Sequence, residues 1–483
     1  MAVDPAIAHL LRRAGFGYFP AEGEYFSRMS LSAAIDMLVD FDQMKDTVDS
    51  FIGTPGYLGT VSRGPFQPNS RVSDTRQRWL FRMVHSPRPL QEKMALFWHN
   101  HFATGYDKVA GQIGRDGASR AFGAKPSEED YGVRGQYELF REYALGNFRD
   151  LLIEVSRDPA MVAWLDGDTN VRAKPQENYA RELMELFTMG VDFFTESDVY
   201  AGARVFTGWN LRNFYPNDDD RYSTFRFRSS QHDTDSKTFS FPIYPDGGKT
   251  IPARSAGSGQ QDGLDLINAV AAHPETGPRL ARKLYTFFVS ELKTPPESFI
   301  QQLAGVYYSS GYDMRAVVGS LLRSAEFQDP ANYFARYSWP VEYVTRLLKA
   351  VGWTGFSASN AITPLANMGQ VLFEPPDVSG WRLGTDWFST GTLLARMNFA
   401  ATLVSNQQFR LLSDALPSAG TPESLFAYMR DRLAPADYDT QASNDLLNYL
   451  YAGAAWTGEE VQVRIKAAGL ARLIGGSSEY QFV

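Results

Sequence analysis

Histidine and carboxylate side chains are the groups of this chain that could do chemistry together. Imidazole and carboxylate ligands suit zinc, iron or manganese and leave coordination positions open to water or substrate. The same groups also serve as general acids and bases. The predicted metal ligands are His99, His101, Glu182, Glu185 and His232. The predicted acid and base groups are Glu182, Glu185, Arg181 and Asp233.

The two glutamates belong to residues 177–187, which are predicted to form one amphipathic helix. At about 100° per residue, all charged side chains of this run fall within roughly 80° of Glu185, and apolar side chains lie opposite. One interpretation is a solvated face, because Glu177 with Arg181 is an ordinary i,i+4 ion pair. The alternative is a polar arc that faces a cavity, with Glu177 in the wall. The histidines elsewhere in the chain favour the cavity.

His99 and His101 stand in the motif FWHNHF at residues 97–102. Two residues apart on a helix, their rings diverge by about 200°, whereas in an extended chain they share a face. Joint ligation of one metal ion therefore requires the helix to end near Trp98. The alternative is that each imidazole is hydrogen-bonded inside an aromatic core. For His232 and Asp233 the alternative is an exposed polar turn.

Composition limits the class of protein. The chain has 483 residues, of which 44% are hydrophobic, and this is enough for one large core or several smaller ones. A net charge of −8 without basic blocks argues against nucleic-acid partners. No apolar run is long enough for a membrane span, and we expect a soluble protein. The chain has zero cysteines, which excludes disulfides, thiolate metal sites and haem-thiolate centres.

Two glycine-containing segments fail as nucleotide-binding motifs. The triplet GKT at residues 248–250 matches the end of a phosphate loop, but Ile243 occupies the position of its first glycine. Residues 257–263 miss the dinucleotide-binding spacing by one residue and are predicted to be a flexible linker. The sequences G-x-S-x-G and H-E-x-x-H do not occur either. We therefore expect no nucleotide cofactor.

The elements that must position the histidines and carboxylates are predicted to be mainly α-helical. Apolar side chains recur at helical spacing through most of the chain. Asp4 and Pro5 are typical of a helix start. The fold class predicted is mainly α, a multi-helical single body with a small β-ribbon insertion around residues 215–250, where apolar and polar side chains alternate. The predicted units are a body at residues 1–410, including the ribbon and loops at 210–262, and a C-terminal helical extension packed on it at 411–483.

Other segments of the chain are predicted to line the site. Arg13, Arg204 and Arg396 stand in otherwise apolar helices, where a guanidinium needs a carboxylate partner. The candidate partners are Glu177, Glu182 and Asp166. The loop at residues 373–382 contains two prolines and a glycine and presents Trp381, either as a core plug or as a pocket wall. We expect Arg13 and Trp381 in the wall of the pocket.

Seven motifs in a fixed order carry a resemblance to a known family. They are LRRAGFG at 11–17, FWHNHF at 97–102, DPAM at 158–161 with LD at 165–166, ENYARELMELFTMG at 177–190, ARVFTGW at 203–209, HD at 232–233 with Lys237, and PPDVSGW at 375–381. On these motifs, over roughly residues 8–400, the chain resembles the bacterial domain-of-unknown-function 1800 family. The resemblance implies a mainly helical fold, a periplasmic or extracellular protein, and a sulfatase-like partner protein encoded nearby.

The chain departs from that family at two points. Many relatives place histidine where this chain has Phe187, so a ligand at that position is absent here. Many relatives also carry an export signal, whereas the amino end of this sequence has no basic segment and no apolar signal core, which leaves a cytoplasmic location open.

These groups together predict a metal-dependent enzyme. Hydrolysis by a metal-bound water, with Glu182 or Glu185 as general base, is the simplest chemistry they support. A metal-dependent oxidoreductase that uses iron is the alternative. A further alternative is a non-catalytic exported scaffold or partner protein, in which the polar residues form a structural network.

Overall fold

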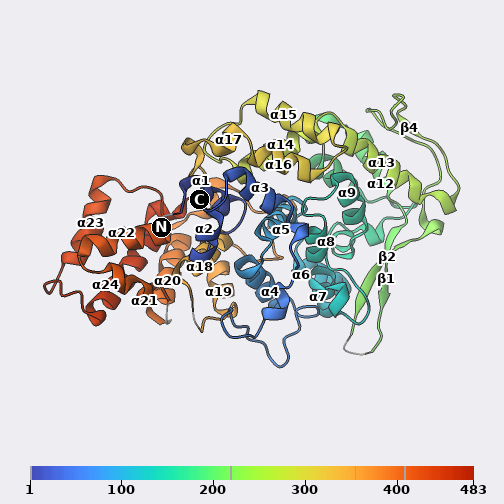
Figure 1. Ribbon diagram of the computed structural model, residues 1–483. Coiled ribbons are helices and arrows are strands. Elements are labelled where there is room, and N and C mark those ends of the chain that lie inside the picture. Colours follow the sequence, from blue (N-terminus) through green and yellow to red (C-terminus); the bar gives the residue numbers. More distant parts are fainter. Residues whose placement is uncertain (1–2, 218–219, 354, 407–409) are drawn as a thin grey trace.

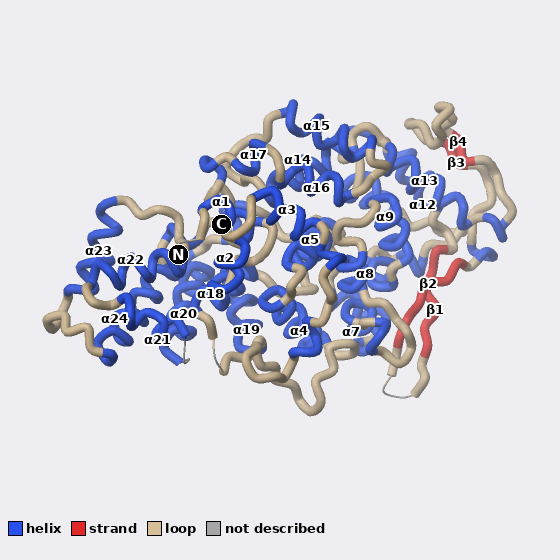
Figure 2. Tube along the Cα trace, viewed as in Figure 1, coloured by secondary structure: helices blue, strands red, loops and turns tan. Residues whose placement is uncertain are grey.

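Helices build the body of the protein, and two small β-ribbons lie at one edge of it (Figure 1, Figure 2). The computed structural model describes residues 3–217, 220–353, 355–406 and 410–483. Within these residues it contains 24 α-helices and two antiparallel sheets of two strands each. The predicted fold class is therefore confirmed. No helix in the described part of the chain is long and apolar enough to cross a membrane.

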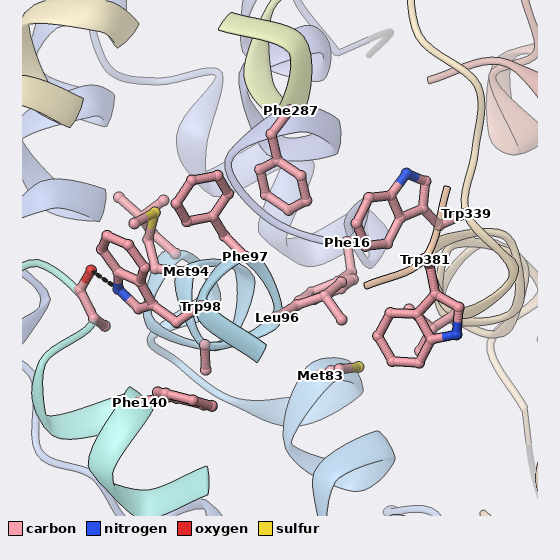
Figure 3. Packing of buried hydrophobic residues seen from close by; sticks show 14 of the residues in the cluster. Phe16, Met83, Met94, Leu96, Phe97, Trp98, Phe140, Phe287, Trp339 and Trp381 are labelled. Carbon is pink, nitrogen blue, oxygen red and sulfur yellow. Dashed lines mark hydrogen bonds between the residues drawn. The ribbon is translucent and has the colours of Figure 1, made fainter. Parts of the chain in front are cut away.

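The amino-terminal helices pack around α5 (Pro89–His101), which is buried on every side. Its residues from Leu90 to His99 have almost no exposed surface, and its two buried charges are paired, Glu92 with Arg141 at 2.8 Å and Lys93 with Glu342. Trp98 of α5 donates its indole N–H to the Ala144 carbonyl at 3.1 Å (Figure 3). The other helices of this part of the chain are α1 (Pro5–Arg13), α2 (Pro20–Phe26), α3 (Leu31–Val39), α4 (Val72–His85), α6 (Tyr106–Ile113), α7 (Arg115–Gly123), α8 (Gln136–Glu142), α9 (Phe148–Arg157) and α10 (Pro159–Trp164).

The ribbons follow in the middle of the chain. Strand β1 (Trp209–Phe214) pairs with β2 (Tyr222–Phe227), with Trp209 opposite Phe227. Strand β3 (Lys237–Thr238) pairs with β4 (Thr250–Ile251). The first strand thus begins a few residues before the predicted insertion at 215–250. The helices that precede and follow the ribbons in the chain are α11 (Asn178–Glu182), α12 (Glu196–Val205) and α13 (Gln260–Ala272).

The second half of the chain covers α5 from the other side and continues into the C-terminal helices. Helices α21 to α24 gather at the end of the body far from the strands (Figure 1). Tyr343 donates its hydroxyl to the Gly475 carbonyl at 2.7 Å and so joins these helices to the body. The helices are α14 (Thr276–Phe288), α15 (Glu297–Ser309), α16 (Met314–Leu322), α17 (Ala325–Gln328), α18 (Pro340–Val351), α19 (Ser359–Asn367), α20 (Thr390–Asn406), α21 (Arg410–Ala415), α22 (Pro422–Leu433), α23 (Thr440–Tyr451) and α24 (Glu460–Gly476).

Two buried arginines bind main-chain carbonyls instead of the predicted carboxylates. Arg13 donates to the Phe288 carbonyl at 2.9 Å and to the Val483 carbonyl at 3.0 Å. Arg396 donates to the Ser338 carbonyl at 2.8 Å. Carbonyls at the end of a helix carry partial negative charge and lack helical partners, and α14 ends at Phe288. Such oxygens satisfy a buried guanidinium without a carboxylate, so the predicted pairing was wrong for both residues.

Candidate functional site

The predicted helix at residues 177–187 changes type halfway along. Helix α11 ends at Glu182, and residues Leu183–Phe187 form a single π-helical turn, which we call the π-turn. Thr188 donates its hydroxyl to the carbonyl of Leu183, five residues back, and Gly190 donates its N–H to the Met184 carbonyl at 3.0 Å. Single π-turns inside helices occur frequently at functional sites. Here the turn leaves the carbonyls of its last residues available to side chains from other helices.

His101 and Lys283 use these carbonyls. His101 of α5 lies with Nε2 at 3.1 Å from the Phe187 carbonyl, and Lys283 of α14 lies with Nζ at 3.2 Å from the Leu186 carbonyl. Lys283 Nζ is also 3.0 Å from His101 Nδ1. A carbonyl can only accept, so Nε2 of His101 carries the hydrogen and Nδ1 accepts from Lys283. Burial, then the charges of Lys283 and Arg279, hold the pKa of His101 well below its usual range.

Lys283 ends a row of charged groups that we call the α14 row. It runs from Glu182 and Glu185 on the polar side of α11 and the π-turn through Arg279 to Lys283 and His101. Among the described residues, neither carboxylate and no guanidinium nitrogen of this row has a hydrogen bond or an ion pair. Glu182, Glu185 and Arg279 are each partly exposed, so solvent takes the place of the missing protein partners.

The pKa values in the α14 row are displaced toward neutrality. Burial, then the charge of Glu185, raises the pKa of Glu182 to about 7. Burial, then the charge of Arg279, lowers the pKa of Lys283 to about 7. Both groups therefore change protonation state near neutral pH, the property expected of general acids and bases.

A cavity of about 280 Å³ adjoins the lysine end of the row. His101 and Lys283 line it, together with Asn100 of α5 and Trp381. The PPDVSGW loop docks onto α5 here, because Asn100 Oδ1 accepts the Trp381 N–H at 2.7 Å. Gly380 has φ of +87°, and a Cβ atom there would lie 2.4 Å from Asn100 Oδ1, so this approach requires glycine.

His99 points elsewhere. Helix α5 continues to His101, so the expected end near Trp98 does not occur and the two imidazoles diverge. Nε2 of His99 accepts the Phe373 N–H at 3.2 Å and thereby holds the start of the Trp381 loop. Its ring packs among aromatic side chains, 5.3 Å from that of Trp381, and burial lowers its pKa to about 3.

His232 belongs to a different buried group, which we call the ribbon network. Its Nδ1 lies 2.8 Å from the Thr207 carbonyl and its Nε2 lies 3.3 Å from Asp262 Oδ2. Asp262 also accepts from Lys237 and from Arg254, each at 2.6 Å. Every charged group of this network has an opposite charge beside it. His232, Lys237 and Asp262 are all shielded from solvent.

The remaining predicted residues make surface or near-surface pairs. Asp233 accepts from Arg204 Nε at 2.8 Å, so Arg204 does have a carboxylate partner, though a different one from those predicted. Arg181 binds Glu177 at 3.1 Å and Glu196 at 2.7 Å on the exposed side of α11. The structure thus brings His101 to the π-turn that follows Glu182, and gives His99, His232, Asp233, Arg181 and Glu177 other partners.

The arrangement limits how a metal ion could be held. Within the described ranges, no three His, Asp or Glu side chains are gathered as a metal ion would require. The imidazoles of His101 and His232 have protein partners on both ring nitrogens, and that of His99 on one. Of the predicted ligands, Glu182 and Glu185 have carboxylates without a protein partner among the described residues.

Lys283 and Arg279 were missed by the sequence interpretation. A signal was present, because residues 276–288 contain Arg279, Arg282 and Lys283 at i, i+3 and i+4 and no acidic residue. Three cations on one face without a carboxylate on the same helix are unusual for a solvated surface in an acidic chain.

A second cavity, of about 320 Å³, lies among α1, α2 and α3. Its lining is apolar except for Tyr25, Ser86 and the Glu22–Lys349 pair, whose charged atoms are 3.2 Å apart. Its two charged groups are thus paired with each other, so the cavity beside Lys283 is the stronger candidate.

Comparison with known proteins gives one match. A family model described as "Protein of unknown function (DUF1800)" matches residues 9–482. The match therefore extends past the last motif, which ends at residue 381, and includes the C-terminal helices. No curated protein and no solved structure matches the chain.

Proposed function

We propose that this chain, which belongs to the DUF1800 family of proteins of unknown function, is an enzyme, most simply a hydrolase, with Lys283 as its acid–base group. The observation that carries the proposal is a lysine with a pKa lowered to about 7 in the wall of a cavity. Near neutral pH a large fraction of such lysines is uncharged, whereas free lysine has a pKa of about 10.4.

The hydrogen bonds of Lys283 support a role as base. A neutral amine has two N–H donors, and two acceptors, His101 Nδ1 and the Leu186 carbonyl, are in place for them. The nitrogen lone pair is then left over for a proton. It can accept that proton from a water molecule that attacks a substrate, and the resulting ammonium can return it to the leaving group.

His101 acts as a positioning residue in this proposal. Its Nε2–H is fixed by the Phe187 carbonyl, so its Nδ1 always presents a lone pair to Lys283. Low basicity keeps the imidazole from taking the proton that Lys283 handles.

Two measurements test the role of Lys283. Competitive acetylation with acetic anhydride over a range of pH, read by peptide mass spectrometry, should give Lys283 a pKa near 7. Chromogenic esters, phosphates and sulfates should show an activity that Lys283→Met lowers about 10²- to 10⁴-fold. Lys45→Met, at an exposed lysine, is the matched control. A Lys283 that titrates near 10 would remove the acid–base assignment.

A divalent metal at Glu182 and Glu185 is the second candidate, because these two carboxylates lack protein partners and lie near enough for Glu185 to raise the pKa of Glu182. Zinc or manganese there would favour hydrolysis, and iron would favour oxidation. Water or substrate would have to complete the coordination, since zinc sites use three or four protein ligands. Elemental analysis of protein purified without chelators, beside the Glu182→Gln, Glu185→Gln double variant, tests this candidate.

Export to the periplasm or cell exterior, and a sulfatase-like partner protein, belong to the proposal through the sequence resemblance alone. Co-purification of the tagged chain with a sulfatase-like protein encoded beside it tests the partner. If Lys283 titrates as free lysine and no metal is bound, a non-catalytic scaffold becomes the preferred function.

A further inference from the structure

The cavity beside Lys283 has a charge balance opposite to that of the whole chain. The chain has 55 acidic and 47 basic residues, yet Arg282, Lys283 and Arg382 line the cavity and no Asp or Glu does. Arg282 is paired with Glu297 at 2.8 Å. Arg382 is exposed, and its guanidinium has no partner among the described residues. A molecule entering the cavity therefore meets uncompensated positive charge.

The polar groups around the cavity are mostly hydrogen-bond donors. Asn100 uses its Oδ1 for the Trp381 N–H, which leaves its Nδ2 hydrogens to be donated. Unused donors beside cations favour a ligand rich in oxygen acceptors.

The rest of the lining is aromatic. Phe97, Phe287, Trp339 and Trp381 contribute their rings (Figure 3). The ring centroids of Phe97 and Phe287, and those of Phe287 and Trp339, are each 5.3 Å apart. The volume of about 280 Å³ is close to twice the roughly 150 Å³ of an apolar cavity that holds benzene. One six-membered ring with a charged substituent fits this space.

We propose that the cavity binds a small oxyanion carried on an aromatic ring, such as an aryl carboxylate or an aryl phosphate. The aromatic walls take the ring, and the guanidinium of Arg382 and the amide N–H groups of Asn100 take the oxygens. This inference rests on the proposed function only where it identifies the bound molecule as the substrate on which Lys283 acts. The binding of such a molecule can be measured without any reaction.

Calorimetric titration of the full chain tests the proposal. The probes are benzoate, phenyl phosphate, neutral benzyl alcohol and inorganic phosphate. The two ring-bearing anions should bind about tenfold more tightly than either benzyl alcohol or inorganic phosphate. Equal binding of benzyl alcohol would overturn the charge requirement, and equal binding of inorganic phosphate would overturn the ring requirement.

Arg382→Gln locates the binding. The substitution should weaken the binding of both ring-bearing anions about fivefold or more and leave the binding of benzyl alcohol unchanged. Arg226→Gln, at an exposed arginine of β2, should change neither. Unchanged anion affinity in Arg382→Gln would place the binding outside this cavity and reject the proposal.

The outcomes separate this inference from the proposed function. Selective anion binding with a Lys283 that titrates near 10 identifies a binding site without acid–base catalysis. A Lys283 pKa near 7 without anion selectivity leaves the catalytic proposal standing and rejects the substrate class.

Discussion

The ribbon network and the α14 row use the same residue types, histidine, lysine, arginine and carboxylate, and differ in how completely they are paired. In the ribbon network, the carboxylate of Asp262 accepts hydrogen bonds from both Lys237 and Arg254, and it also lies beside the imidazole of His232. In the α14 row, Glu182, Glu185 and Arg279 have no such partner among the described residues. A complete network stabilises the fold, whereas an incomplete one costs free energy and is expected mainly where function requires it.

The strongest test of this comparison is Asp262→Ala. The substitution leaves Lys237 and His232 buried without their carboxylate, and breaking a buried pair in this way costs about 3–5 kcal/mol. Urea unfolding followed by circular dichroism should show that loss. Asp235→Ala, at an exposed aspartate of the same segment, should change stability by less than about 0.5 kcal/mol. Similar effects of the two substitutions would mean that the ribbon network is not structural.

Lys283→Met should behave in the opposite way. Activity should fall about 10²- to 10⁴-fold, while the free energy of unfolding should change by less than about 1 kcal/mol, because the substitution removes a charge that has no opposite charge beside it. Chromogenic assays and urea unfolding measure the two effects. A destabilisation as large as that of Asp262→Ala would place the α14 row among structural networks.

The pH dependence of stability sharpens the contrast further. The pKa of Glu182 is raised from 4.5 to about 7 in the folded chain. The folded state therefore binds more protons between these values, and the stability that Glu182 contributes is complete below pH 4.5 and lost as pH rises through 7. Glu182→Gln should abolish this loss of stability. The change in the free energy of unfolding should be only on the order of 1 kcal/mol, because solvent reaches the carboxyl group and screens it. Urea midpoints of both proteins between pH 4 and about 8 measure it. A constant difference across that range contradicts the raised pKa.

The smallest effect is expected at Arg181. Its partners Glu177 and Glu196 are exposed, and surface pairs of this kind contribute about 0.2–1 kcal/mol. Arg181→Gln should change the thermal midpoint little and leave activity within about twofold of the unchanged protein, because the residue does not touch the cavity. A large loss of activity would return Arg181 to the catalytic group predicted from the sequence.

Local signals in the sequence predicted the helices well. Asp4 caps the first helix, with its carboxylate accepting from the N–H groups of Ala6 and Ile7, and Pro5 is the first helical residue. Both features depend only on neighbours in the chain. The π-turn was not predicted, because it depends on the hydroxyl of Thr188 and on Gly190, which no periodicity in apolar residues reveals.

Candidate site residues were harder to predict because their partners are distant in the chain. His101 meets Lys283 across 182 positions, and no spacing rule applies at that range. Asp262 lies in residues 257–263, which were interpreted as a flexible linker. The structure instead places it at the start of α13, and Gly259 is there because a Cβ atom would lie 2.0 Å from the His232 ring. Glycine signalled close packing here, not flexibility.

The π-turn makes the site sensitive to the length of the chain and not only to its composition. Removing one uncharged residue from Leu183–Phe187 would leave four residues where the π-turn has five, so the turn could not form and the carbonyls at its end would be displaced. All the charged side chains of the α14 row would survive such a deletion, yet the carbonyls of Leu186 and Phe187 would turn away from Lys283 and His101. A homologue shorter by one residue at this point could therefore keep the other six motifs and every charged residue of the row and still have lost the site, so alignment gaps here are more informative than substitutions.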